Sequence, residues 1–106
     1  MEQEQIKWEL EVVKNPIKCT IDKSGVYVLI GRRSYVECTQ HKVDIRVDIM
    51  ATKGDLPVHS FVGFGNDVRK RVIAWLFDYC TISNEHASYI GYEICRAMMD
   101  EKFVQV

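Results

Sequence analysis

The sequence predicts an α+β fold, in which an antiparallel meander sheet of four or five strands is followed by two helices packed on one face and a short C-terminal strand. Two observations support this fold class. Apolar and polar residues alternate through much of the first half of the chain, which is the period of a strand. After Gly65 the apolar spacing changes to three or four residues, the period of a helix. The 106 residues match the size of a single domain, so we expect one domain over residues 1–106.

The first expected strand covers residues 6–13, where Ile6, Trp8, Leu10 and Val12 alternate with charged residues. Asn15 and Pro16 should end it, because proline cannot donate to a sheet ladder. A turn over residues 21–25 then leads into the next strand.

The second expected strand, residues 26–30, is apolar on both faces, as in a central strand. Residues 31–34 should turn the chain into a third strand over residues 35–39, and residues 40–42 should reverse it again. Residues 43–49 alternate apolar and charged side chains, which predicts a strand with one solvated face. A loop is expected over residues 51–59, ending in a short extended piece at residues 61–64.

The first helix is expected to begin at Asn66 as its N-cap, with an apolar stripe of Val68, Val72, Ile73 and Leu76. The second helix has clearer signals. Ser83 can cap it, and Ile82 and Ala87 occupy the two positions of a hydrophobic staple.

The apolar stripe of this second helix is Ala87, Ile90, Gly91, Ile94 and Met98. Gly91 costs roughly 1 kcal/mol relative to alanine inside a helix. We therefore expect another strand or helix to approach closely at Gly91. Residues 103–106 alternate in polarity, which predicts an edge strand at the C-terminus.

The formal net charge of -1 offers no general attraction to nucleic acid or to an anionic membrane, and it argues against a nucleic-acid partner. No apolar run reaches the roughly 18 residues of a membrane-spanning helix, and the acidic start lacks the pattern of a signal peptide. We expect no membrane partner and a cytoplasmic location.

The four cysteines, Cys19, Cys38, Cys80 and Cys95, show neither a Cys-x-x-Cys pair nor histidines at zinc-finger spacing. We expect reduced, mostly buried thiols, with one reactive or metal-bound thiol as the alternative. No metal site and no cofactor are predicted.

The first candidate site is the turn formed by Gly63, Phe64, Gly65 and Asn66, which opens the first helix. Free backbone N–H groups at such a turn can hold a phosphate or a carboxylate. Phe64 lies between two glycines, so its ring is expected to be exposed for stacking. The spacing matches neither a Walker loop nor a dinucleotide-binding fingerprint.

Arg69, Lys70 and Arg71 add cations to the first turns of this helix, where they oppose its macrodipole. A bound anion would explain them. The alternative is that they only solvate the outer face, with Asp67 at the first helical position satisfying the dipole. Arg32 and Arg33 would join the same site only if that end of the sheet lies near the helix start.

The second candidate site is the row of His86, Tyr89, Glu93 and Arg96, whose spacing of three and four residues places them along one side of the second helix. Such a row can perform acid–base chemistry or hold a polar ligand. The alternative is a solvated face with an ion pair between Glu93 and Arg96. No serine or cysteine lies in a nucleophile elbow, so the residues favour a role without catalysis.

His86, Ala87, the step Tyr89-Ile90-Gly91 and Glu93, followed by Phe103-Val104-Gln105-Val106, form a segment that resembles the closing motif of a known domain. That uncharacterised domain occurs in cyanobacteria and archaea, sometimes attached to pterin-binding or archaeal thymidylate-synthase-like proteins. The resemblance covers roughly the C-terminal 45 residues. This chain departs from the pattern at Tyr92, where the family has a basic residue, and at Val106, where the family continues with an acid. The family has no established activity, and the resemblance implies a folate, pterin or nucleotide context.

The leading functional hypothesis is a non-catalytic domain that binds a small anionic ligand, nucleotide-like or pterin-like, at the start of the first helix. Its proposed ligand-binding residues are Gly63, Phe64, Gly65, Asn66, Arg69, Arg71, His86, Tyr89 and Glu93.

The alternative hypothesis is a homo-oligomeric or hetero-oligomeric interaction module without a ligand. It would use the terminal strand or a helix face, because Trp75, Phe77, Met98 and Met99 exceed what one narrow apolar stripe requires.

Overall fold

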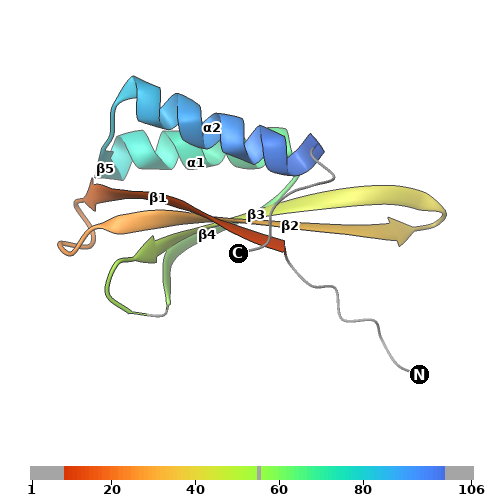
Figure 1. Ribbon diagram of the computed structural model, residues 1–106, viewed down its shortest axis with the longest axis horizontal. Coiled ribbons are helices and arrows are strands. Elements are labelled where there is room, and N and C mark those ends of the chain that lie inside the picture. The colour runs from red at the N-terminus through yellow and green to blue at the C-terminus, as the bar shows by residue number, and fades with distance from the viewer. Residues whose placement is uncertain (1–8, 55, 100–106) are drawn as a thin grey trace.

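The computed structural model describes residues 9–54 and 56–99 of the chain. It has a five-stranded antiparallel sheet, and two helices cover one face of that sheet (Figure 1). The elements are β1 Glu9–Cys19, β2 Val26–Glu37, β3 Gln40–Ala51, β4 Pro57–Gly63, α1 Gly65–Tyr79, β5 Cys80–Thr81 and α2 Asn84–Met99. The strands lie in the order β4-β3-β2-β1-β5. The predicted α+β class and the antiparallel meander are confirmed.

Strand β1 passes through Asn15 and Pro16, so the predicted end of the first strand is wrong. The register of β1 against β2 shifts between Val13 and Ile17, which marks an irregularity of the bulge type. A bulge accommodates a residue that cannot donate to the ladder, and pairing resumes beyond it. Residues 6–8 of the predicted strand lie outside the described residues.

Strand β2 is continuous from Val26 to Glu37, so the turn predicted over residues 31–34 and the separate strand over residues 35–39 are both wrong. Its register with β3 runs without a shift from Val26 opposite Ala51 to Glu37 opposite Gln40. Only Cys38 and Thr39 remain between the strands, with φ of 51° and 65°. A two-residue hairpin turn of this hand needs positive φ at both positions, and Asn-Gly is the usual choice. The sequence does not predict this turn, because Cys-Thr is not one of the residue pairs typical of such turns.

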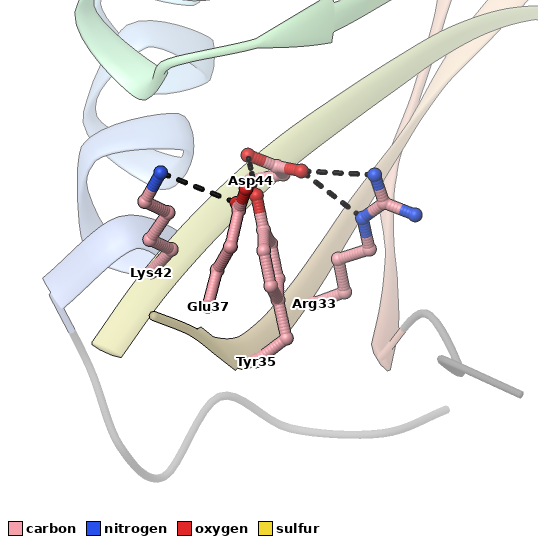
Figure 2. A network of polar contacts seen from close by, with 5 residues as sticks. All are labelled: Arg33, Tyr35, Glu37, Lys42 and Asp44. Atoms are coloured by element: carbon pink, nitrogen blue, oxygen red, sulfur yellow. Dashed lines mark hydrogen bonds and ion pairs between the residues drawn. The ribbon is translucent and has the colours of Figure 1, made fainter. Parts of the chain in front are cut away.

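The outer part of the β2–β3 hairpin extends beyond the two helices (Figure 1). Polar side chains link its strands there (Figure 2). Arg33 donates to Oδ2 of Asp44 from Nε at 3.1 Å and from Nη2 at 2.9 Å, and the Tyr35 hydroxyl donates to Oδ1 of Asp44 at 3.5 Å. Lys42 pairs with Glu37 at 3.2 Å. Cross-strand pairs of this kind help to hold the hairpin together where no helix covers it.

The core lies between the sheet and the helices. Alternate residues of β2 and β3 face the helices, and the apolar stripes of both helices face the sheet. Its fully buried members are Val26, Val28, Ile30, Ile45, Val47, Ile49, Val68, Val72, Leu76, Ile90, Ile94 and Ala97. Burying a Val, Leu or Ile side chain contributes about 1.5–3 kcal/mol, so this layer is the main source of stability. Both predicted helical stripes face it, with Ile73 and Met98 half-buried at its edge.

Helix α1 begins at Gly65 with Phe64 as its N-cap, and no side-chain cap bond is seen at Phe64 within the described chain. The assignment of Asn66 as the cap is therefore wrong, and Asp67 occupies the third helical position rather than the first. Strand β4 is longer than the short extended piece expected at residues 61–64, because it starts at Pro57.

Gly65 is required by packing. A Cβ at this position would lie 2.5 Å from Sδ of Met98 and 3.2 Å from its Cγ, so the end of α2 closes over the start of α1.

Helix α2 begins as predicted. The Ser83 hydroxyl oxygen accepts a hydrogen bond from the backbone N–H of His86 at 3.1 Å, which is an N-cap interaction. The close approach expected at Gly91 is also confirmed, because a Cβ there would touch Cδ and Cγ of Arg69 at 3.6 and 3.7 Å. The approaching element is α1.

Neither α1 nor α2, the helices of the described chain, is long and apolar enough to cross a membrane. The predicted C-terminal strand at residues 103–106 lies outside the described residues. All four cysteines are free thiols, but only Cys19 is buried and Cys38 is exposed, so the expectation of mostly buried thiols is wrong.

Candidate functional site

Arg69 and Arg71, the two arginines of the predicted anion site, lie on different sides of α1. Arg69 runs along α2 over Gly91. Two residues later the helix has turned by about 200°, and Arg71 lies on the side of β4. Its guanidinium lies 5.6 Å from the ring centre of Phe61, and its Nη1 lies 3.4 Å from Oδ2 of Asp67. The two arginines therefore do not share one binding site.

The predicted row on α2 lies on the side away from α1. Gly91 faces α1, and Glu93 follows it by about 200° of helical turn. Glu93 is buried at 7% exposure, and its Oε2 accepts from Arg96 Nε at 3.0 Å and Nη2 at 2.7 Å. His86 is half-buried and Tyr89 is exposed. The expected ion pair is present, but on a buried carboxylate rather than on a solvated face.

The nine proposed ligand-binding residues are thus divided among separate surfaces. The first residue of α1, Gly65, packs against Met98. Phe64 is 74% exposed, as expected. Arg69 points along α2, Arg71 points to β4, and the row of His86, Tyr89 and Glu93 lies across α2 from Arg69.

Arg32 and Arg33 lie on opposite faces of the sheet. In the sheet register Arg32 lies opposite Ile45, and Ile45 lies opposite Gly63, so Arg32 is level with the start of α1. It is buried on the helix-covered face at 8% exposure. Arg33 points to the other face, as successive strand residues do, and pairs with Asp44. Only Arg32 comes near the helix start, beneath the helices.

A groove of about 550 Å³ lies between α1 and α2. Arg69, Ile73 and Phe77 follow one another at four-residue intervals and form the α1 wall, because this spacing lines up one side of a helix. Small residues on α2 leave the space open. The lining residues are Arg69, Ile73, Phe77, Asn84, Ala87, Ser88, Gly91, Tyr92 and Cys95. We call this space the interhelical groove.

Arg69 is the charged group of the interhelical groove. Its aliphatic carbons pack over Gly91, and its Nε is buried without a hydrogen-bond partner among the described residues. A buried donor without an acceptor costs about 1–3 kcal/mol, and more when the group is charged. Among the described residues that line the groove, none has a carboxylate. Arg69 is also the one charged residue among these described lining residues, so the groove carries a positive charge.

The groove offers both polar and apolar groups for binding a small molecule. Asn84, Ser88 and the Tyr92 hydroxyl can exchange hydrogen bonds, whereas Phe77 and Ile73 offer apolar surface. Within residues 9–54 and 56–99, no three His, Cys, Asp or Glu side chains gather where they could hold a metal ion.

Ile73 was expected as core, and the other groove residues apart from Arg69 were not proposed as ligand contacts. One signal could have found them. Arg69, Ile73 and Phe77 form one row at four-residue intervals, and the small residues Ala87, Gly91 and Cys95 form another.

Comparisons with protein-family models, with curated proteins and with solved structures found no match to this chain.

Proposed function

We propose that this domain is a non-catalytic binding module for a small anionic molecule, which lies in the interhelical groove with its negative group at Arg69. The observation that supports this function is the buried Arg69 Nε, which has no acceptor among the described residues. Arg69 belongs to the anion site expected from sequence. The proposed ligand site lies in the groove rather than at the start of α1, because Met98 packs against Gly65.

The size and lining of the groove suit a small organic anion. Ligand pockets usually hold about 300–1,000 Å³ and combine apolar walls with a few polar groups, and this groove has about 550 Å³. Phe77 and Tyr92 supply aromatic rings from opposite helices. A flat ring system bearing a phosphate or carboxylate, as in a nucleotide or a pterin acid, matches this combination. The resemblance of the C-terminal part of the chain favours the same class.

Thermal unfolding with two probes, a nucleoside monophosphate and a pterin carboxylic acid, tests the proposal. A ligand at one hundred times its Kd stabilises a protein by about 2.7 kcal/mol, which corresponds to a rise in Tm of about 10 °C for a domain of this size. We expect at least one probe to raise the Tm. Arg69→Gln should abolish the rise.

Arg71→Gln is the matched control, because it removes the same charge from the other side of α1. It should leave the probe-induced rise in Tm intact. A rise that survives Arg69→Gln, or that Arg71→Gln removes equally, would contradict the placement of the ligand in the groove.

The alternative function is a protein-interaction module, and exposed apolar residues on the outer surface of the helices favour it. Tyr92 is 63% exposed and Met99 is 75% exposed, and with Cys95 and Arg96 they line a second hollow of about 430 Å³. Trp75 does not add to this exposed surface, since its ring stacks on the His59 ring with 5.6 Å between their centroids.

Native mass spectrometry separates the two functions. A stable dimer or larger assembly that Met99→Glu dissociates, and that no anion stabilises, favours the interaction module, since Met99 lines the second hollow and not the interhelical groove. A monomer whose Tm rises with an anion favours the ligand-binding module.

A further inference from the structure

Two free cysteines from distant parts of the chain lie directly opposite each other in the sheet. Strand β5 pairs antiparallel with the end of β1, where the α1–α2 connection meets the sheet (Figure 1). In this register Cys19 is opposite Cys80, and Lys18 is opposite Thr81. Both cysteines are unbridged thiols. The spacing of the cysteines in the sequence does not predict this pair.

The hydrogen bonds of this ladder determine how close the two side chains are. The backbone N–H of Thr20 donates to the carbonyl oxygen of Tyr79 at 2.8 Å. In an antiparallel pair, hydrogen-bonded and non-hydrogen-bonded positions alternate, so Cys19 and Cys80 occupy a non-hydrogen-bonded position. There the Cα atoms are about 4.5 Å apart and the side chains are closest. This separation lies at the short end of the range of about 4.4–6.8 Å that disulfides span.

The two thiols interact in the reduced state. Burial, a hydrogen bond with Cys19 and the charge of Cys19 together raise the pKa of Cys80 to about 12. A raised pKa means that Cys80 keeps its proton, so its S–H donates to the sulfur of Cys19. Cys19 lines a surface groove, so it is the sulfur that an approaching oxidant meets first.

A small oxidant has a route to Cys19. A groove of about 520 Å³ opens beside it, and Lys18 and Lys23 contribute to its lining. Two lysines favour an approaching molecule with negative charges. A low-molecular-weight disulfide that carries carboxylates, such as oxidised glutathione, has this character.

We propose that Cys19 and Cys80 form a redox-active dithiol, which an anionic low-molecular-weight disulfide oxidises to an intramolecular disulfide. The Cys19 thiolate attacks one sulfur of the oxidant, forms a mixed disulfide and releases one thiolate. Cys80 then loses its proton and attacks the Cys19 sulfur, which releases the second small thiol. The protein loses two electrons and two protons, and the oxidant gains them as two thiols.

The new bond would tie the α1–α2 connection to the end of β1. In the reduced protein this junction is held by two ladder pairs and by Thr20, whose backbone N–H and hydroxyl both donate to the Tyr79 carbonyl. Because the Cα separation lies at the short end of the disulfide range, we expect this bridge to be more easily reduced than an unstrained structural disulfide. The inference does not depend on ligand binding in the interhelical groove.

The test uses the Cys38→Ala/Cys95→Ala variant, which keeps only this pair of thiols. The folded variant is equilibrated in buffers of reduced and oxidised glutathione, quenched with acid, alkylated and weighed intact. We expect one monomeric oxidised species, about 2 Da lighter than the dithiol and inert to alkylation. Peptide mapping should link the Cys19 and Cys80 peptides, in this variant and in the unmodified chain.

The same equilibrium measured in urea is the control for geometry. The equilibrium constant for disulfide formation should be at least about tenfold larger in the folded variant, and by linkage the urea midpoint should rise on oxidation. Adding Cys80→Ala should trap the mixed disulfide on Cys19. The proposal is overturned if the folded variant accumulates only mixed disulfides or intermolecular dimers, or if its equilibrium constant does not exceed that of the unfolded chain.

Discussion

Replacing each of the two helical glycines at the α1–α2 contact by alanine should change the stability in opposite directions. Alanine is favoured over glycine in a helix by up to about 1 kcal/mol. At Gly91 the new Cβ would meet Arg69 carbons at 3.6 and 3.7 Å, which is ordinary contact, so this gain should be realised. At Gly65 it would meet Sδ, Cγ and Cβ of Met98 at 2.5, 3.2 and 3.3 Å. Met98 must then move.

The expected magnitudes follow from these distances. Overpacking a well-filled site costs about 1–3 kcal/mol, and the helix preference offsets only part of this in the first turn of α1. We expect Gly65→Ala to lower the free energy of unfolding by about 1 kcal/mol and Gly91→Ala to raise it by about 0.5–1 kcal/mol. Urea unfolding followed by circular dichroism measures both, with the slope m compared to confirm that the unfolded state is unchanged.

A double-mutant cycle identifies the cause. In a Met98→Ala background the clash at Gly65 is largely removed, so Gly65→Ala should cost at least about 1 kcal/mol less than in the original chain. Additive effects of Gly65→Ala and Met98→Ala would refute the contact between the end of α2 and the start of α1. So would a Gly65→Ala variant that is as stable as Gly91→Ala.

Three further substitutions test local features. Ser83→Ala should lower the free energy of unfolding by about 1 kcal/mol, because α2 loses its N-cap. Ser83→Asp should retain the stability, since aspartate also caps helices. Equal free energies of unfolding for the two variants would contradict the cap. Thr39→Gly should raise the Tm, because a β-branched residue at φ 65° is strained and glycine is not. Thr52 is exposed and lies outside the positive-φ region, so Thr52→Gly should not raise the Tm. Because the folded pKa of Cys80 is raised from 9.0 to about 12, its protonation stabilises the fold below pH 9 and this contribution is lost as the pH rises toward 12. Urea unfolding across that pH range should therefore be less pH-dependent in Cys80→Ala, and an unchanged slope would contradict the shift.

The helices were predictable from sequence because their signals are local. Ser83 and the stripe that includes Ile90 and Ile94 lie within a few turns, and the structure uses them as expected. The sheet was harder. Gly31 resembles a turn residue but lies inside β2, and the actual turn at Cys38 lacks the residues that usually mark one. Strand continuity here depends on pairing with β3, which short-range patterns do not encode.

The candidate site shows the same limit. The cations in the first turns of α1 singled out Arg69, because a positive charge there opposes the helix macrodipole; in the structure Arg69 lines the interhelical groove. The direction of Arg69 is seen only in the packing of α1 on α2, where the Arg69 carbons lie over Gly91, far along the chain. Sequence spacing placed Arg69 and Arg71 together, whereas helix packing separates them.

The contacts at the two glycines show that the interhelical groove and the helix start are separate places. Each glycine is covered by a side chain of the opposite helix: Met98 covers Gly65, and the carbons of Arg69 cover Gly91. The first contact places Met98 against the first residue of α1, and the second places the Arg69 side chain along the groove wall. Arg69 and Tyr79, the residue before Cys80, lie about 15 Å apart along α1, at 1.5 Å per residue. Arg69→Gln should therefore abolish the anion-induced rise in Tm while leaving the glutathione equilibrium of the dithiol unchanged, so that each proposal can fail without the other.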